Sequence, residues 1–307
     1  MSVVVLLVVI VILTLLIHIV PGDPATTVLG PRASPEAIQK VRAAMGLDKS
    51  VFSQIGDFIW NVLHGNLGTD VFTGRSIGNM VSDALPNTVA LALAGLLLAV
   101  ISGVPLGIYS AHHKGSWADR LTAMFSVSMT TIPTYVAGLV LLIVFSVTFR
   151  IMPATGTGKP GDISDYLKHL ILPAAALAIT WIGYIARLVR AGLLEVMNEN
   201  YIQAARAAGI SERRIRYKYA LKNAMIPTIA VIGNGLGGLM GGAVFVEVIF
   251  ARSGMGTLIL KAIEDRNYPL VRVGVLCITI LFIIINLLTD ILYAAFDKRI
   301  QLGKARE

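Results

Sequence analysis

The chain has 307 residues, of which 55% are hydrophobic and 14% are charged, and its mean hydropathy is +0.75. A soluble domain carries about 25% charged residues, so this composition excludes an ordinary water-soluble protein. The net charge of +8 would suit a nucleic-acid-binding protein, but the basic residues gather in connections between apolar runs rather than on a soluble domain.

Six apolar segments are long enough to cross a bilayer as helices, which takes about 20 residues. No cleavage site of the Ala-x-Ala type follows the first segment, so we interpret it as a retained span rather than a removed signal peptide. The single Cys277 excludes an intrachain disulfide. The sequence predicts an all-α polytopic membrane protein with one transmembrane domain over residues 1–307, its spans at 2–20, 87–111, 122–148, 169–190, 224–248 and 270–295.

The distribution of Lys and Arg predicts the orientation, because short cytoplasmic loops are enriched in these residues. The connection 187–223 holds eight of them, which favours placing it in the cytoplasm. With six spans, both termini are then cytoplasmic as well. We therefore expect an outer loop at 21–86 and a cytoplasmic loop at 191–223.

The outer loop carries its own helix signals. Ser34 can cap a helix that begins at Pro35, with Glu36 near the positive end of the helix dipole, and Gly46 can end that helix. A second helix is expected from Val51 to Leu63, where apolar residues recur at helical spacing. We expect it to pack on the outer membrane surface.

Two glycine-containing motifs resemble nucleotide sites but do not fit them. Gly158-Lys159 lacks the glycine five residues earlier and the Ser or Thr that would follow it in a phosphate-binding loop. The segment Gly233–Gly238 matches the dinucleotide fingerprint in letters, but it lies inside an apolar run without a βαβ unit. Close helix packing is the favoured interpretation, and a role in bending around a substrate stays open. The candidate residues for packing or the pathway are Asn234, Gly235, Gly238 and Gly242.

The sequence offers no catalytic residue and no metal site. None of the five histidines has the partner spacing of a zinc site, and no nucleophile motif is present. Asp290 and Glu247 lie near the ends of predicted spans rather than at mid-membrane, where ion-coupled carriers commonly place acidic residues. A coupling ion is therefore not indicated, and the energy source is expected on another chain.

The stretch from Asn198 to Pro227 is the most informative part of the chain. Its first helix, from Tyr201 to Ala208, should present a smooth alanine surface, and Gly209 can take the positive φ that ends such a helix. Ser211 is expected to cap a second, basic helix. An ordinary positively charged loop and a DNA-binding helix-turn-helix are the alternatives. The second lacks a third helix and a soluble domain, so nucleic acid is not an expected partner.

These residues carry a family resemblance. Ala204, Ala205 and Gly209 match the pattern Glu-Ala-Ala, three residues, then Gly, with Gln203 in place of the glutamate. The chain resembles, over nearly its whole length, the permease subunits of bacterial ABC importers, in the branch for dipeptides, oligopeptides, glutathione and nickel. Departures are Tyr219 and Lys222 within the insert and Arg252-Ser253 where family members often carry Trp-Pro. The other matching segments are Pro21–Ala25, Gly46–Asp48, Gly65–Gly68, Leu221–Pro227, Phe245–Glu247, Gly254–Gly256 and Asn267–Pro269.

The resemblance implies a type I ABC importer permease in the bacterial inner membrane that moves peptides or related small solutes. It implies as partners a second homologous permease subunit, two cytoplasmic ATPase subunits, an extracytoplasmic substrate-binding protein and membrane lipid. This chain would bind no cofactor and would not be an enzyme, because ATP and magnesium would bind the ATPases. The alternative is a stand-alone secondary transporter. The residues expected to contact the ATPase are Tyr201, Ala204, Ala205, Arg206, Gly209, Ser211 and Arg213.

Overall fold

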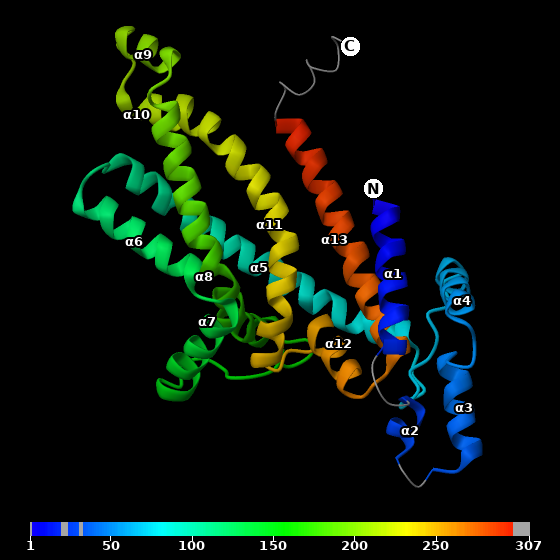
Figure 1. The fold of residues 1–307 in the computed structure, drawn as a ribbon. Coiled ribbons are helices and arrows are strands. Elements are labelled where there is room, and N and C mark those ends of the chain that lie inside the picture. The colour runs from blue at the N-terminus through cyan, green and yellow to red at the C-terminus, as the bar shows by residue number, and fades with distance from the viewer. Residues whose placement is uncertain (1, 20–23, 31–32, 297–307) are drawn as a thin grey trace, which may run out of the picture. The chain divides into compact units, whose positions relative to one another are not determined.

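The computed structural model describes residues 2–19, 24–30 and 33–296, and the regular elements within these ranges are helical (Figure 1). The helices are α1 (Ser2–Ile19), α2 (Pro24–Leu29), α3 (Pro35–Met45), α4 (Val51–Leu63), α5 (Ile77–His112), α6 (Trp117–Thr131), α7 (Thr134–Leu141), α8 (Ile163–Val196), α9 (Asn200–Ala207), α10 (Glu212–Arg214), α11 (Leu221–Ile249), α12 (Met255–Glu264) and α13 (Tyr268–Phe296), with π-helical segments at Leu142–Thr148 and Ile215–Ala220.

The chain divides into two compact units. The first unit consists of the described residues up to Thr88 together with Ser253–Ile283. The second consists of Val89–Arg252 together with the described residues after Ile283. Because of these boundaries, α5 and α13 each contribute residues to both units.

The all-helical fold class is confirmed, whereas the count of six spans stays a prediction. Three helices are long and apolar enough to cross a membrane: Ile77–His112, Ile163–Val196 and Tyr268–Thr289. Counting each of two bent helix pairs as one span gives up to five within the described residues. Helices α5 and α8 extend beyond the predicted spans 87–111 and 169–190, into polar residues at their ends.

The span predicted at 122–148 corresponds to two helical segments with a sharp bend between them. The chain turns by 103° between Trp117–Thr131 and Thr134–Thr148. Pro133 explains the break, because proline lacks an N–H and disfavours helical geometry in the residue before it. Ile132 is accordingly extended, with ψ of 120°.

The helix signals within the predicted outer loop are confirmed. The Ser34 hydroxyl accepts a hydrogen bond from the Ala37 N–H, Pro35 opens α3, and Gly46 ends it with φ of +69°. Helix α4 spans Val51–Leu63 as expected and is capped by the Ser50 hydroxyl. The part of the Pro21–Ala25 segment that precedes Pro24 lies outside the described residues.

Helix α8 is the centre of the second unit, where it packs against α6, α7 and α11. Glycines allow α5 to approach α8 closely: a Cβ on Gly95 would lie 2.9 Å from Leu177 Cβ, and one on Gly107 would lie 2.6 Å from the Ala186 carbonyl oxygen. Buried Ile185 and Val189 of α8 face this contact and join a hydrophobic cluster that continues to the cytoplasmic loop predicted at 191–223. The loop is therefore built on the same helix that organises the unit.

Candidate functional site

The predicted docking loop is an ordered hairpin between the end of α8 and the start of α11 (Figure 1). Helix α9 has eight residues and is too short to be stable alone in water. Packing stabilises it, because Ile202 is fully buried and Ala205 is 9% exposed. Both join the hydrophobic cluster around α8, together with Ile215 in the second, helical arm of the hairpin. The loop is thus fixed by its apolar side.

The turn of the hairpin has the geometry that its glycine predicts. Gly209 has φ of +77°, its N–H bonds to the Arg206 carbonyl at 2.9 Å, and the Ile210 N–H bonds to the Ala205 carbonyl at 3.1 Å. These bonds satisfy carbonyls left free at the end of α9. Ser211 then occupies the N-cap position of α10.

The expected capping bond from Ser211 is wrong for the described structure, where its side chain makes no cap hydrogen bond. Helix α10 has only three residues before the π-helical segment Ile215–Ala220 begins, and the Ser211 carbonyl accepts a hydrogen bond from the Ile215 N–H. The second helix of the insert is also not a separate helix, because it continues through this segment into α11.

Polar contacts between solvent-exposed side chains link the two arms of the hairpin. Arg206 Nε donates to Glu212 Oε1 at 2.6 Å, and Arg216 Nε lies 3.7 Å from Glu212 Oε2. Across the base, Asn223 Nδ2 donates to the Tyr201 hydroxyl at 2.7 Å. Single exposed pairs contribute about 0–1 kcal/mol each, so their main effect is to orient the loop.

The hairpin brings together the residues predicted to contact an ATPase, with one exception. Ala205 faces inward and supports the loop rather than its surface. The exposed members of the predicted set are Tyr201, Ala204, Arg206, Gly209, Ser211 and Arg213. The solvent-exposed side of the hairpin thus has small side chains around the turn and cationic side chains beyond it. Another protein surface can pack closely against such a shape.

A buried ion pair lies just before this hairpin and was missed by sequence reasoning. Asp119, in the first turn of α6, is 6% exposed at its side chain and accepts hydrogen bonds from Arg190 Nε at 2.7 Å and Nη2 at 2.8 Å. Its carboxylate also accepts from the Ser110 hydroxyl at 2.5 Å and the Gly115 N–H at 2.9 Å. Four donors on one carboxylate join the end of α5, the α5–α6 turn, α6 and α8.

Three glycines of α11 lie at close contacts with α8. A Cβ on Gly235 would lie 2.6 Å from Trp181 Cζ3, and one on Gly238 would lie 3.2 Å from Trp181 Cζ2. A Cβ on Gly242 would lie 3.3 Å from Leu177 Cδ2. All three therefore receive side chains of α8. Asn234 lies in α11, but its side chain falls outside the described part of the chain.

In the first unit, Asn267, from one of the segments that carry the family resemblance, contacts a buried carboxylate. Asp70 is 3% exposed, and it accepts hydrogen bonds from the Thr73 N–H at 2.8 Å, from the Thr73 hydroxyl and from the Asn267 amide. Burial opposes the charged form of Asp70, but the hydrogen bonds from Thr73 and Asn267 outweigh it and lower the pKa of the carboxyl. The loop after α4 is thereby tied to the start of α13.

Comparison with known proteins gives the family. The model of the binding-protein-dependent transport system inner membrane component matches residues 103–302, and the model of the N-terminal part of such components matches residues 1–92. The chain is 34% identical over 296 residues to the glutathione transport system permease protein GsiC of Escherichia coli K12, covering 96% of this chain and 94% of that protein. It is 35% identical over 288 residues to a protein of Sinorhizobium fredii described as a probable peptide ABC transporter permease, covering 94% of this chain and 92% of that protein.

Solved structures agree on the fold. A chain of the methionine ABC transporter MetNI in an inward-facing conformation matches with a TM-score of 0.60 at 18% identity, over 71% of this chain and 97% of that chain. An amino acid ABC transporter crystallised with histidines matches with a TM-score of 0.52 at 17% identity, over 72% and 94%. The expected importer-permease architecture and inner-membrane location are confirmed. The chain belongs to the family of binding-protein-dependent transport system inner membrane components.

Proposed function

We propose that this chain is one permease subunit of an ATP-driven importer that moves peptides or related small solutes, glutathione among them, into the cytoplasm. Relatives that match nearly the whole chain carry peptide and glutathione transport in their names, which supports this class of cargo. The complete transporter would contain a second permease, two ATPases that hold ATP and magnesium, and an extracytoplasmic binding protein.

The observation that carries the coupling proposal is the ordered hairpin around Gly209. Its inner side is fixed to α8 and α11 by Ile202 and Ile215, which are fully buried. Its outer side is unoccupied by other described elements and exposes Ala204, Gly209 and Ser211. A surface held this firmly to two long helices would transmit the movement of a bound ATPase to them directly.

The first experiment is to purify the chain gently from its native membrane and identify the co-purifying proteins by mass spectrometry. Recovery of a second permease with ATPase chains is the expected result. Recovery of the chain alone, with uptake that needs no ATP, would replace this proposal by the stand-alone secondary transporter.

The docking role is tested by Gly209→Val. A valine would be strained at φ of +77° by about 1–2 kcal/mol, although no atom stands within 4 Å of the new Cβ. The matched control is Gly161→Val, which meets the same strain at φ of +84° with equally open surroundings but lies on a connection predicted to be extracytoplasmic. In the reconstituted transporter we expect Gly209→Val to reduce ATP-driven uptake severalfold more than the control. Unchanged uptake and unchanged ATP hydrolysis in Gly209→Val would refute the docking role.

A further inference from the structure

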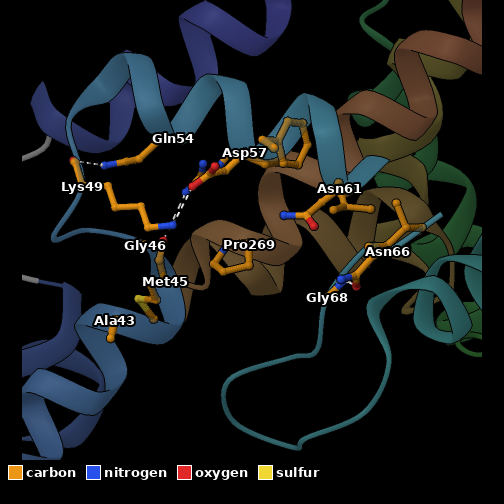
Figure 2. A pocket seen from close by; sticks show the side chains of 14 residues that line it. Ala43, Met45, Gly46, Lys49, Gln54, Asp57, Asn61, Asn66, Gly68 and Pro269 are labelled. Atoms are coloured by element: carbon orange, nitrogen blue, oxygen red, sulfur yellow. Dashed lines mark hydrogen bonds and ion pairs between the residues drawn. The ribbon is translucent and has the colours of Figure 1, made fainter. Parts of the chain in front are cut away.

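The first unit contains an open pocket that the transport proposal does not use. Its walls come from α3, α4, the segment after α4 and the start of α13, and its volume is about 250 Å³. Figure 2 shows Ala43 and Met45 of α3, Asn61 of α4 and Pro269 of α13 around it. The pocket lies entirely within one unit of the chain.

The charges that line this pocket do not balance. Its charged side chains are Lys49, Asp57 and Arg272. Lys49 Nζ and Asp57 Oδ2 lie 2.6 Å apart as an exposed ion pair, drawn as a dashed line in Figure 2, and neutralise each other. Arg272 remains as one positive charge, and it is only 6% exposed.

Arg272 has incomplete partners among the described residues. Its Nη2 donates to the Met45 carbonyl at 3.5 Å, at the limit of a hydrogen bond, and its guanidinium carbon lies 5.8 Å from the centre of the Phe58 ring. Its Nε is buried without a hydrogen-bond partner, and no carboxylate of the described chain stands within 4.0 Å of it. Buried charges in proteins are normally paired and fully hydrogen-bonded.

The partners that are present cannot replace an anion. The Met45 carbonyl belongs to the last turn of α3, whose dipole end is equivalent to about half a negative charge. The Phe58 ring and the carboxyl end of α3 attract the guanidinium of Arg272. Neither can accept the two parallel hydrogen bonds that a planar guanidinium can donate. An oxyanion with two oxygens in one plane can form them.

We propose that this pocket is a binding site for a small carboxylate, with the carboxylate group on the Arg272 guanidinium. Its volume lies below the roughly 300–1,000 Å³ of sites for drug-sized ligands, so it fits a compact acid rather than a long peptide. The side-chain amides of Asn61 and Asn66 and the apolar walls of Leu67 and Val273 also line it. These groups suit a ligand with a short polar body, such as an acylated amino acid.

The test uses the full chain in nanodiscs of phosphatidylcholine, with binding followed by saturation-transfer difference NMR. The probe is N-acetylalanine, and the neutral comparison is N-acetylalaninamide. We expect the acid to bind and the amide to show no saturation transfer. Arg272→Gln should weaken binding of the acid about tenfold or more, because hydrogen bonds to charged groups are the strong ones.

A second pair of variants keeps the test independent of Arg272. Ala43→Trp places a large ring at an exposed position that lines the pocket, and Gln39→Trp places the same ring at an exposed position of α3 outside it. We expect loss of binding in the first and wild-type binding in the second. Equal binding of acid and amide, binding retained in both Arg272→Gln and Ala43→Trp, or no binding of the acid would each overturn the proposal.

A lipid headgroup is the other source of an oxyanion, and one further arm distinguishes it. Repeating the measurement in nanodiscs that contain phosphatidylglycerol should leave the affinity for N-acetylalanine within twofold. If phosphatidylglycerol abolishes binding of the acid in the wild type, the site belongs to a lipid phosphate and the proposal fails. Because the pocket is outside the cytoplasmic hairpin, either result leaves the docking experiment at Gly209 unaffected.

Discussion

The buried pair between Asp119 and Arg190 makes the sharpest prediction about stability. Asp119→Asn keeps the size of the side chain but removes its charge and leaves one acceptor oxygen for four donors. One oxygen can accept two of these bonds at most, so two charge-assisted bonds, each contributing about 1.5–3 kcal/mol, are lost. Breaking a fully buried pair costs about 3–5 kcal/mol.

Solvent reduces this cost at one end of the pair. Arg190 is 31% exposed at its side chain, so water can solvate part of the abandoned guanidinium. We therefore expect Asp119→Asn to lower the free energy of unfolding by about 2–4 kcal/mol. For a chain above about 150 residues, a loss of that size shifts the melting temperature by about 4–16 °C.

The assay is thermal unfolding of the purified chain in detergent, followed by circular dichroism. A double-mutant cycle with Arg190→Gln isolates the interaction, since the double variant should be less destabilised than the two single changes would give together. Arg187→Gln, an exposed cation on the same helix, is the control and should change the melting temperature by no more than about 2 °C. Additive losses across the cycle, or an Asp119→Asn variant as stable as Arg187→Gln, would refute the role given to this pair.

Two further predictions concern helix packing and acid sensitivity. Gly235→Ala places a methyl group 2.6 Å from Trp181 and should lower the free energy of unfolding by about 1–3 kcal/mol through overpacking. Gly241→Ala meets no atom within 4 Å and should leave the free energy of unfolding unchanged or raise it by up to about 1 kcal/mol. Equal melting temperatures for the two variants would contradict the packing role. Asp70 contributes stability that is present above its unfolded-state pKa of about 3.9 and is lost as the pH falls through its lower folded-state pKa. The melting temperature of the wild type should therefore fall more steeply between pH 5 and pH 3 than that of Asp70→Asn, and parallel curves would show that Asp70 is not the group responsible.

Local signals in the sequence were sufficient where the determining residues are neighbours in the chain. Ser34, Pro35 and Gly46 fix the ends of α3 through contacts within four residues, and Gly209 fixes its turn through its own φ. The bend at Pro133 has an equally local cause, but it lies inside a continuous apolar run, and hydropathy alone does not mark it. The extent of α5 beyond the apolar run was hidden because its first turns are polar.

The remaining features depend on partners that are distant in sequence. Asp119 meets Arg190 across 71 positions, and nothing near either residue identifies the other, although Ser116 followed by Asp119 is a recognisable helix start. Gly235 and Gly241 look alike in the sequence and differ only because Trp181 stands over the first. Ala205 belongs to a recognised pattern, yet only the position of α8 shows that it faces inward.

The break at Ile132–Pro133 bears on the order in which the chain can be assembled. Irregular backbone is tolerated inside a bilayer only where protein or water satisfies its polar groups. Here the carbonyl of Ile132 accepts a hydrogen bond from the Thr180 hydroxyl of α8 at 3.3 Å. That donor is synthesised 48 residues later, so the segment from α6 to α7 leaves the ribosome before its partner exists. Pro133 can bend the segment before α8 exists, but until α8 is made the Ile132 carbonyl depends on the translocon or on water for its hydrogen bond.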